Sequence, residues 1–241
     1  MSEIIVAPGT TTPQLGLVVT STEAIRLEQT TPDAPVVVTG SAASDTVVAV
    51  SITDTTAFTI NGELGNDILS GAAGSDTISG GDGEDQIVGD LGNDTITGGA
   101  GADDLDGGAG RDQINGGAGA DIIAPGPGRD TITTGPGNDV IRFEARSLNG
   151  GVDRITDFTP QDTIEISRQL LRGSGLQPGR LSTSDFRAVR SIRDLDDEEA
   201  AKIIYERRTG YVYYNRDNGR DVRLFQLDRN LNISAADFEI F

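Results

Sequence analysis

Residues 62–142 divide into nine consecutive blocks of nine residues without an insertion: GELGNDILS, GAAGSDTIS, GGDGEDQIV, GDLGNDTIT, GGAGADDLD, GGAGRDQIN, GGAGADIIA, PGPGRDTIT and TGPGNDVIR. The fourth residue is glycine, the sixth is aspartate and the eighth is Ile or Leu in every block. A disordered linker rich in glycine and aspartate has no reason to keep one phase over such a length. The tract is therefore interpreted as a repeat architecture.

Each block predicts a turn followed by a very short strand. Glycine in the turn permits positive φ and close backbone approach, and the last three residues alternate outward, inward, outward. One block cannot bury its aliphatic side chain alone, so we expect two blocks to form one coil of a flattened solenoid with parallel strands between coils. The expected interior stripe is Leu69, Ile78, Ile87, Ile96, Leu105, Ile114, Ile123, Ile132 and Ile141.

The acidic charge of the chain is concentrated in the same tract. The whole chain carries 38 acidic and 19 basic residues, for a net charge of −19, and residues 62–142 hold 15 acids against three arginines. Stacked aspartates would repel one another, and one aliphatic per block buries little surface against the entropy of ordering a glycine-rich backbone. We therefore expect the tract to be largely unfolded until a cation binds it.

Calcium is the cation that the tract predicts. Ca²⁺ takes six to eight oxygen ligands in flexible geometry, from carboxylates and backbone carbonyls, whereas Mg²⁺ requires stricter octahedral geometry. The loops alternate between the two sides of the solenoid, five on one side and four on the other. Four and three gaps between loops then predict at most about seven internal ions.

The composition excludes several other classes of function. The chain has no cysteine and no histidine, which excludes disulfide scaffolds, thiol nucleophiles, His-ligated zinc and the Ser-His-Asp triad. The acidic charge disfavours nucleic acid and anionic membranes as partners. No apolar run predicts a membrane span, and the N-terminus lacks the basic and apolar regions of a cleaved signal peptide.

The blocks resemble the G-G-x-G-x-D-x-U-x nonapeptide of RTX (repeats-in-toxin, hemolysin-type) calcium-binding proteins. The resemblance implies an all-β fold, a parallel β-roll with two nonapeptides per coil and calcium between the loops. The implied side-chain ligands are Asp67, Asp76, Asp85, Asp94, Asp103, Asp112, Asp121, Asp130 and Asp139. Candidate carbonyl ligands in the turns are Gly62, Gly65, Gly71, Gly74, Gly80, Gly83, Gly89, Gly92, Gly98, Gly101, Gly107, Gly110, Gly116 and Gly119.

Some blocks depart from this pattern. Glu63, Ala72 and Asp90 replace the second glycine, which requires that they adopt a compatible φ. Pro125 and Thr134 replace the first glycine of the last two blocks, where we expect stiffer loops and incomplete sites.

Residues 1–61 predict an N-terminal β cap with partly degenerate repeats. Strand-like runs occur at 15–19, 36–38 and 46–52, and Asp45 lies nine residues before Asp54. The phase is expected to slip by four residues at 58–61. Because terminal repeats of solenoids are atypical, the cap is expected to continue the stack with hydrophobic rungs. A small independent binding domain is the alternative.

Residues 143–241 predict a β-rich (α+β) C-terminal capping region. Residues 150–166, 203–214 and 233–238 resemble the segments that follow RTX solenoids, and 203–214 also predicts a hairpin around a Thr-Gly turn. Ser182 with Asp185, and Ser234 with Asp237, have the spacing of helix capping boxes. Residues 187–199 predict a solvated charged face, with a docking patch as the alternative.

Two further calcium sites in this region are weaker candidates. Asp153, Asp157 and Asp162 are one possible set. The second set is Asn215, Asp217 and Asp221, whose alternate oxygen donors can cup calcium. That segment lacks the closing Glu of an EF-hand loop, so a plain hairpin turn is the alternative.

The predicted function is that of a non-enzymatic, secreted calcium-binding protein that folds on calcium outside the cell. The resemblance implies export by a type I secretion machinery through an uncleaved signal in residues 143–241, and a surface-layer, matrix or adhesion-like role with an unidentified partner. A non-catalytic C-terminal module of an RTX hydrolase is one alternative, although the chain contains neither H-E-x-x-H nor G-x-S-x-G. An intracellular calcium buffer or sensor is the other.

Overall fold

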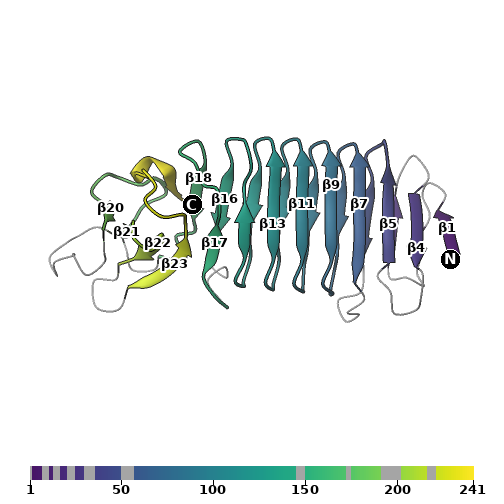
Figure 1. Cartoon of the computed structure of the whole chain (residues 1–241), viewed down its shortest axis with the longest axis horizontal. Helices are drawn as coiled ribbons and strands as arrows, with labels where there is room; N and C mark the ends of the chain where they lie inside the picture. The colour runs from purple at the N-terminus through teal and green to yellow at the C-terminus, as the bar shows by residue number, and fades with distance from the viewer. Residues whose placement is uncertain are drawn as a thin grey trace.

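The computed structural model is a long, flattened solenoid of two facing β-sheets (Figure 1). The structure describes residues 2–6, 11–12, 17–20, 25–29, 36–49, 57–144, 150–171, 175–190, 202–215 and 221–241. Within these residues the only helix is the 3₁₀ turn η3 (Ala235–Asp237). The all-β fold with a parallel β-roll, expected from the nonapeptides, is confirmed.

The strands of the roll alternate between the two sheets. Sheet A contains, in spatial order, β5 (Val36–Ser41), β7 (Phe58–Leu64), β9 (Thr77–Asp82), β11 (Thr95–Ala100), β13 (Gln113–Ala118), β15 (Thr131–Thr133) and β17 (Asp153–Ile155). Sheet B contains β6 (Thr46–Ala49), β8 (Ile68–Ser70), β10 (Gln86–Val88), β12 (Asp104–Asp106), β14 (Ile122–Ala124), β16 (Val140–Phe143) and β18 (Thr163–Ile166). All neighbours in these two runs pair in parallel.

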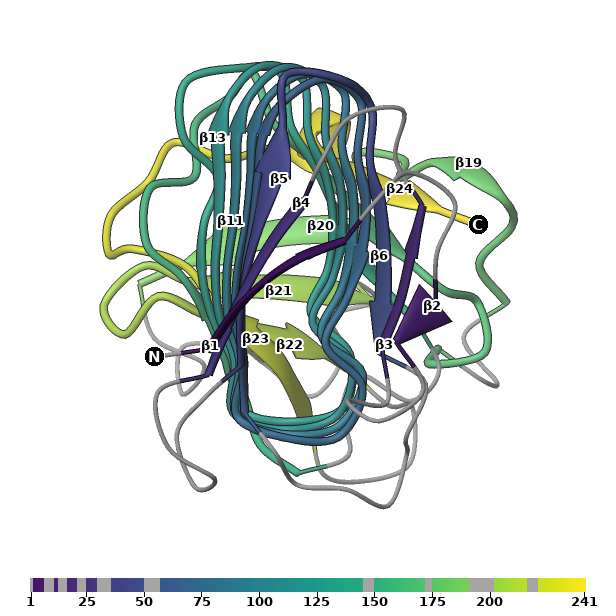
Figure 2. The ribbon, with the colours of Figure 1, turned by 90° about the vertical axis from the view of Figure 1, so that its right-hand side faces the viewer.

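The register shows that two nonapeptides make one coil. Thr95 pairs with Thr77 on one side and with Gln113 on the other, in steps of 18 residues. Figure 2 looks along the stack, where the coils superpose as one elongated loop with a sheet on each long side. This repetition places equivalent residues of alternate blocks in straight columns.

The interior column is the aliphatic residue at the eighth position of each block. Its nine members are at most 2% exposed: Leu69, Ile78, Ile87, Ile96, Leu105, Ile114, Ile123, Ile132 and Ile141. Val38 and Ile60 extend the column on the N-terminal side of the nonapeptides, and Ile155 and Ile164 extend it on the C-terminal side. One core therefore runs through the roll and both flanks.

The N-terminal flank adds one more parallel coil before the strands become antiparallel. β5 and β6 pair in parallel with β7 and β8. Beyond them, β4 (Ile25–Gln29) and β1 (Ser2–Val6) continue sheet A, and β3 (Leu17–Thr20) and β2 (Thr11–Thr12) continue sheet B, all antiparallel. The expected continuation of the stack by a β cap is visible in this pairing. Asp54 lies outside the described residues.

The expected phase slip at residues 58–61 is wrong. Thr59 and Asn61 pair with Thr77 and Ser79 at the regular step of 18 residues. The step from Asp45 to Asp67 is 22 residues, so the four extra residues lie before Phe58. Phe58 and Ile60 are buried, at 6% and 1% exposure, and this inward pair fixes the strand in phase with the roll.

The C-terminal flank closes the other end of the stack. Sheet A continues from β17 through β23 (Val222–Gln226), β22 (Tyr211–Tyr214) and β21 (Ile203–Glu206) to β20 (Phe186–Val189). Sheet B continues from β18 through β24 (Phe238–Ile240) to β19 (Gly179–Arg180). The predicted hairpin is confirmed, because β21 and β22 pair antiparallel around Thr209 and Gly210.

The two predicted capping boxes have different outcomes. Ser234 caps η3 with Asp237 in a reciprocal capping box, as predicted. Ser182 and Asp185 do not begin a helix: they form a turn, and the chain then enters β20, which pairs with β21. Strand pairing at this edge outweighs the local capping pattern.

Two further observations complete the fold. Arg187 and Arg190 of the predicted charged face are exposed, and residues 191–199 of that face lie outside the described residues. In the part of the chain that the structure describes, no helix has the length and apolar character needed to cross a bilayer.

Candidate metal centres

Two straight rows of aspartates run along the roll where the loops meet the strands; each aspartate directly precedes a strand, except Asp153, which is the first residue of β17. The row before the sheet A strands consists of Asp76, Asp94, Asp112, Asp130 and Asp153, and the row before the sheet B strands of Asp67, Asp85, Asp103, Asp121 and Asp139. None of these side chains is more than 2% exposed. Within the described part of the chain no basic side chain is buried beside these ten carboxyl groups, so they require another source of positive charge.

One oxygen of each carboxyl group accepts a hydrogen bond from the coil below, that is, from the preceding coil on the N-terminal side. The Oδ1 atom of Asp112 accepts a hydrogen bond from the backbone N–H of Asp94 at 2.8 Å, and that of Asp121 accepts one from Asp103 at 3.0 Å. The same bond repeats along both rows. It fixes each side chain in one orientation, so the second oxygen has a defined position.

The second oxygen of these groups has no partner. Among the described residues, the buried Oδ2 atoms without any hydrogen bond are those of Asp67, Asp76, Asp85, Asp94, Asp103, Asp112, Asp121, Asp130, Asp139 and Asp153. An ionised carboxylate oxygen buried without a donor is strongly destabilising, and buried charges are paired or coordinate metals. The two rows are therefore sets of oriented anionic oxygens that a cation would satisfy.

The first glycine of the first seven blocks leaves space beside this oxygen. A Cβ placed on Gly62 would lie 2.1 Å from Oδ2 of Asp67 and 2.5 Å from the carbonyl oxygen of Gly80, one coil further on. A Cβ on Gly98 would lie 2.4 Å both from Oδ2 of Asp103 and from the carbonyl oxygen of Gly116. A carboxylate of one coil and a carbonyl of the next thus converge on a cradle that a side chain would fill.

The fourth glycine has a different role, because it allows the coils to stack. A Cβ on Gly101 would lie 1.7 Å from the carbonyl oxygen of Gly83, and one on Gly92 would lie 1.4 Å from that of Gly74. Such distances are far inside van der Waals contact. The close approach explains why this position is glycine in all nine blocks.

The second position of each block has a left-handed backbone. Glu63, Ala72 and Asp90 adopt φ values of 76°, 69° and 70°, as their replacement of glycine requires. The equivalent Gly81 and Gly99 have φ values of 116° and 124°. The loop shape is therefore kept in the departing blocks at the cost of local backbone strain.

Burial raises the pKa of the row carboxyl groups. The pKa is raised to about 6 for Asp67, Asp76, Asp94, Asp103, Asp130 and Asp139, to about 7 for Asp112 and to about 8 for Asp153. Desolvation is the largest cause, the N–H bond from the coil below opposes it, and neighbouring carboxylates in the row add to it for Asp112. Without a cation, the folded roll therefore favours protonated carboxyl groups.

The last two blocks keep their carbonyl oxygens despite losing the first glycine. A Cβ on Gly107 would lie 2.6 Å from the carbonyl oxygen of Pro125, and one on Gly116 would lie 2.4 Å from that of Thr134. The main-chain carbonyl oxygens that face the coils below are thus preserved. Pro125 and Thr134 carry a Cβ where the earlier blocks leave space, so the cradles of their own blocks differ.

The weaker C-terminal candidates separate into different environments. Asp153 continues the first row, with its Oδ2 atom unpartnered and its Oδ1 atom bonded by the N–H of Asp130 at 2.9 Å. Asp157 accepts from the N–H groups of Thr134 and Gly135, at 2.8 and 2.9 Å. Asp162 accepts from the N–H of Asp139 at 3.2 Å and from that of Thr159 at 2.7 Å.

The other C-terminal candidate set is only partly described. The backbone N–H of Asn215 bonds to the carbonyl oxygen of Lys202 at 2.8 Å, where β22 ends. Burial raises the pKa of Asp221, which precedes β23. Asp217 lies outside the described residues. These positions match the strand ends of a hairpin between β22 and β23.

Asp153 belongs to the first row, and Asp45 contacts Asp67, although the nonapeptide period predicts neither position. Asp153 follows Asp130 by 23 residues instead of 18, which hides its place in the row. Asp45 precedes Asp67 by 22 residues and donates its N–H to that carboxylate at 2.7 Å. The side chain of Asp45 is satisfied by Ser41, whose N–H and hydroxyl bond to Oδ2 at 2.7 and 3.1 Å.

The donor set fits a hard divalent cation. Within the described residues no three acidic side chains converge on one point; each cradle combines a single carboxylate with main-chain oxygens. Calcium accepts mixed carboxylate and carbonyl ligands in flexible geometry, and magnesium keeps several waters in a stricter octahedron. The geometry therefore favours calcium.

Comparison with known proteins identifies the repeats. The model of the RTX calcium-binding nonapeptide repeat (4 copies) matches residues 61–96, 88–123, 97–132 and 115–145. A search of the curated proteins finds no match. The matched residues span the two aspartate rows from Asp67 to Asp139 and the glycine cradles beside them. Residues 61–145 of this chain are therefore RTX calcium-binding nonapeptide repeats.

Proposed function

We propose that this chain is a secreted calcium-binding protein whose roll folds when calcium binds between its coils. The observation that carries the proposal is the set of ten buried Oδ2 atoms without a partner, aligned in two rows. A divalent ion beside each atom would supply the missing interaction and neutralise the repulsion along the row. No catalytic role is assigned to any residue.

The proposed ligands are the row aspartates together with the turn carbonyls of the next coil. Asp153 joins the nine nonapeptide aspartates because its Oδ2 atom is also buried without a hydrogen-bond partner. Five carboxylates in each row leave four gaps per row, which raises the proposed number of internal ions to at most about eight. Asp157 and Asp162 are instead proposed to cap the end of the roll, because backbone donors already occupy their oxygens.

Folding on calcium follows from the balance of forces in the roll. The interior is a single column of aliphatic residues, whereas a glycine-rich backbone loses much conformational entropy when it is ordered. The buried carboxylates oppose the folded state further unless they are protonated or bound to a metal. Calcium binds the folded state only, so its binding free energy adds directly to stability.

The proposed setting is outside the cell, reached by type I secretion. In a cytosol low in calcium the acidic tract stays extended, which suits transport of an unfolded chain; higher calcium outside then folds it. The C-terminal region, 143–241, is proposed to carry the secretion signal. A structural role at a surface or in a matrix fits a stiff rod of this kind, by analogy of architecture only.

The test of calcium binding is a titration followed by far-UV circular dichroism and calorimetry. We expect a cooperative gain of β signal, several ions bound per chain and little response to magnesium. The triple variant Asp94→Asn, Asp103→Asn and Asp112→Asn should have a higher midpoint calcium concentration, because asparagine keeps the Oδ1 hydrogen bond but loses the charge.

The matched control removes the same charge from exposed positions. Asp82→Asn, Glu84→Gln and Asp104→Asn together lie on exposed side chains of the same tract. This variant should leave the midpoint unchanged or lower it. Equal midpoints for the two triple variants would contradict the proposed ligands.

Export is tested separately by transplanting segments. A passenger protein fused to the N-terminal side of residues 143–241 should reach the medium in cells that carry a type I secretion machinery. The same passenger fused to residues 62–142 should stay inside. Retention of both fusions would contradict the proposed route while leaving calcium binding untouched.

A further inference from the structure

A basic hollow lies on the outer surface of sheet A, where the roll meets the C-terminal strands. Its volume is about 480 Å³, and its lining combines Arg111, Arg129 and Arg154 with Tyr211, Gln226 and the row aspartate Asp130. The arginines come from successive coils: Arg111 and Arg129 precede β13 and β15, and Arg154 lies in β17. Arg111 and Arg129 occupy equivalent positions in consecutive coils of sheet A, about 4.8 Å apart, whereas Arg154 is in register with Thr131, two residues further along the strand.

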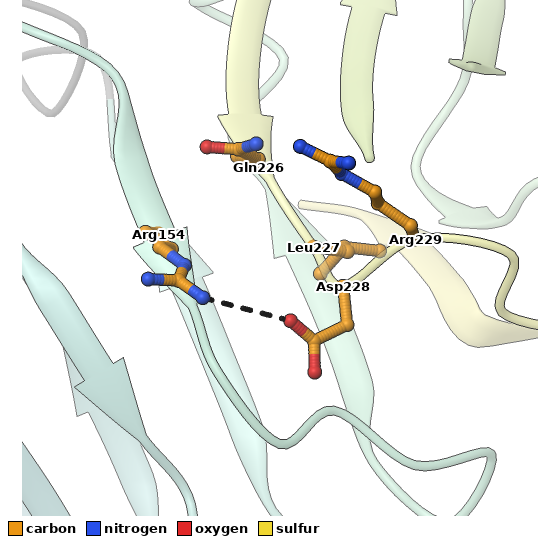
Figure 3. Close-up of a pocket in the computed structure, with 5 residues that line it drawn as sticks. All are labelled: Arg154, Gln226, Leu227, Asp228 and Arg229. Carbon is orange, nitrogen blue, oxygen red and sulfur yellow. Dashed lines mark ion pairs between the residues drawn. The ribbon is translucent and has the colours of Figure 1, made fainter. Parts of the chain in front are cut away.

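A second hollow adjoins the first and extends it toward the C-terminal strands. It has a volume of about 290 Å³ and shares Arg154 and Gln226 with the first, adding Leu227, Asp228 and Arg229. In Figure 3 the side chain of Arg229 extends toward Gln226, and the guanidinium of Arg154 faces Asp228. We call the two hollows together the arginine groove.

The positive charge of this groove is not used in strong internal ion pairs. Arg154 lies 3.8 Å from Asp228, and both side chains are about half exposed, at 58% and 48%. Within the described residues no ion pair involves the exposed side chains of Arg111 and Arg129. A half-exposed pair at that distance contributes little, so the four guanidinium groups remain available.

The placement of the groove contrasts with the charge of the molecule. Residues 62–142 contain only three arginines among 15 acids, and two of the three, Arg111 and Arg129, line the groove. Gly151 leaves room for Arg129, because a Cβ on Gly151 would lie 2.5 Å from the Cβ of Arg129. The groove is thus a local positive surface on a strongly acidic protein.

The uncharged lining indicates what kind of anion fits. The Arg223 guanidinium covers one face of the Tyr211 ring, 4.5 Å from its centroid, which leaves the other face for a ligand. Thr131 provides a hydroxyl group, and Gln226 provides its side-chain oxygen, because its Nε2 atom donates to the Thr209 carbonyl oxygen at 2.8 Å. Arginine binds carboxylates in bidentate geometry, and an aromatic ring beside hydroxyl and amide groups can pack on a sugar and bond its hydroxyls. A long nucleic acid would extend over the acidic roll and be repelled.

We propose that the arginine groove binds a short acidic oligosaccharide, with its sugar carboxylates on the guanidinium groups of Arg111, Arg129 and Arg154. The ligand is a glycan chain with regularly spaced uronate groups. The exposed arginines lie on the outer side of sheet A, and because Asp130 also lines the hollow, the groove borders the calcium cradles. It would attach the roll sideways to a short acidic segment of a glycan.

The test measures binding of a tetrasaccharide of alternating glucuronate and N-acetylglucosamine to the full chain at saturating calcium, by calorimetry. We expect saturable binding that weakens about tenfold or more for Arg129→Gln and for Arg154→Gln, since each loses a charge-assisted hydrogen bond. Arg180→Gln removes one exposed arginine from β19 of the other sheet and should bind as the parent does. The same tetrasaccharide with its carboxyl groups reduced to alcohols should bind at least tenfold more weakly.

Four results would overturn the proposal. These are equal binding of the reduced tetrasaccharide, unchanged affinity in both groove variants, binding of inorganic phosphate as tight as that of the glycan, and tighter binding of a single-stranded oligonucleotide. The calcium midpoint of each groove variant separates this site from the proposed function. An unchanged midpoint together with lost glycan binding supports the groove, whereas failed calcium folding of the parent chain would contradict the calcium proposal alone.

Discussion

At the scale of single residues, the nonapeptide is a set of steric requirements. The fourth glycine allows the backbone to approach the coil below, and the first leaves space beside a carboxylate and a carbonyl. The second requires a left-handed φ that Glu63, Ala72 and Asp90 adopt without the freedom of glycine. Identical letters in the motif thus have different physical causes, and substitutions at each should have different consequences.

Substitution at the fourth position should prevent close stacking. Gly101→Ala would place a Cβ 1.7 Å from the carbonyl oxygen of Gly83. We expect a loss of about 3 kcal/mol in the free energy of unfolding of the calcium-loaded chain, because the coils must separate. Thermal unfolding at saturating calcium measures this, with Ala102→Gly in the same loop as the control that should change stability by less than about 1 kcal/mol.

Substitution at the second position should have the opposite sign. Glu63→Gly relieves a φ of 76° on an exposed residue, and we expect a gain of about 0.5–1 kcal/mol. Glu63→Gln removes the same charge and keeps the strained backbone. If both variants gain the same stability, charge and not backbone strain limits this position.

At the scale of elements, the two aspartate rows act as units. Each carboxyl group is bonded to the coil below and repelled by its neighbours, so protonation and metal binding compete along the whole row. The pKa values are raised in the folded state above the ordinary value of an aspartate. The stability of the metal-free roll must therefore depend on pH.

The sign of this dependence follows from the raised pKa. A group whose pKa is higher in the folded state binds more protons there, so its contribution is present at low pH and lost as pH rises through the folded pKa. With an ordinary pKa of 3.8 and folded-state pKa values of about 6 for Asp94, about 7 for Asp112 and about 8 for Asp153, the loss extends from about pH 4 to about pH 8.

The metal-free chain should therefore gain β signal on acidification from pH 8 to pH 5, and the calcium midpoint should rise over the same interval because protons compete with calcium. Circular dichroism in chelator and calcium titrations at each pH measure both effects. A calcium midpoint that does not move with pH would show that the ions bind groups other than the row carboxylates.

The elements differ in how far the sequence predicts them. The strict period of residues 62–142 predicted the coil, its parallel strands, the interior column and the aspartate rows, because each block repeats one set of local constraints. The flanks break the period: steps of 22 and 23 residues obscure the continuation of the rows to Asp45 and Asp153. The capping-box spacing at Ser182 predicts a helix start, which is wrong because the chain enters β20 and pairs with β21, and this pairing is nonlocal.

At the scale of the whole molecule, the roll is a one-dimensional stack that requires closed ends. β23 covers β17 at the end of sheet A, and Phe225 stacks on Phe143 with ring centroids 4.6 Å apart. In such a stack each coil contacts only its neighbours, so an end with a fixed core favours the ordering of the coil beside it. The C-terminal region is therefore expected to promote folding of the roll.

Loss of this contact should affect calcium-dependent folding at a distance from the ions. Phe225 is fully buried, and we expect Phe225→Ala to lower the free energy of unfolding by about 3–5 kcal/mol and to raise the calcium midpoint. Phe241→Ala removes an exposed ring from the same region and serves as the control. A midpoint unaffected by Phe225→Ala would show that the roll folds independently of its cap.

The most direct test of the account is small-angle X-ray scattering of the full chain with excess chelator and with saturating calcium, at neutral pH. The account predicts an expanded, flexible chain in chelator and a compact rod in calcium, with magnesium failing to replace calcium. A chelated chain with the same compact scattering profile as the calcium-loaded one would contradict the claim that the unpartnered carboxylates need the ion to fold.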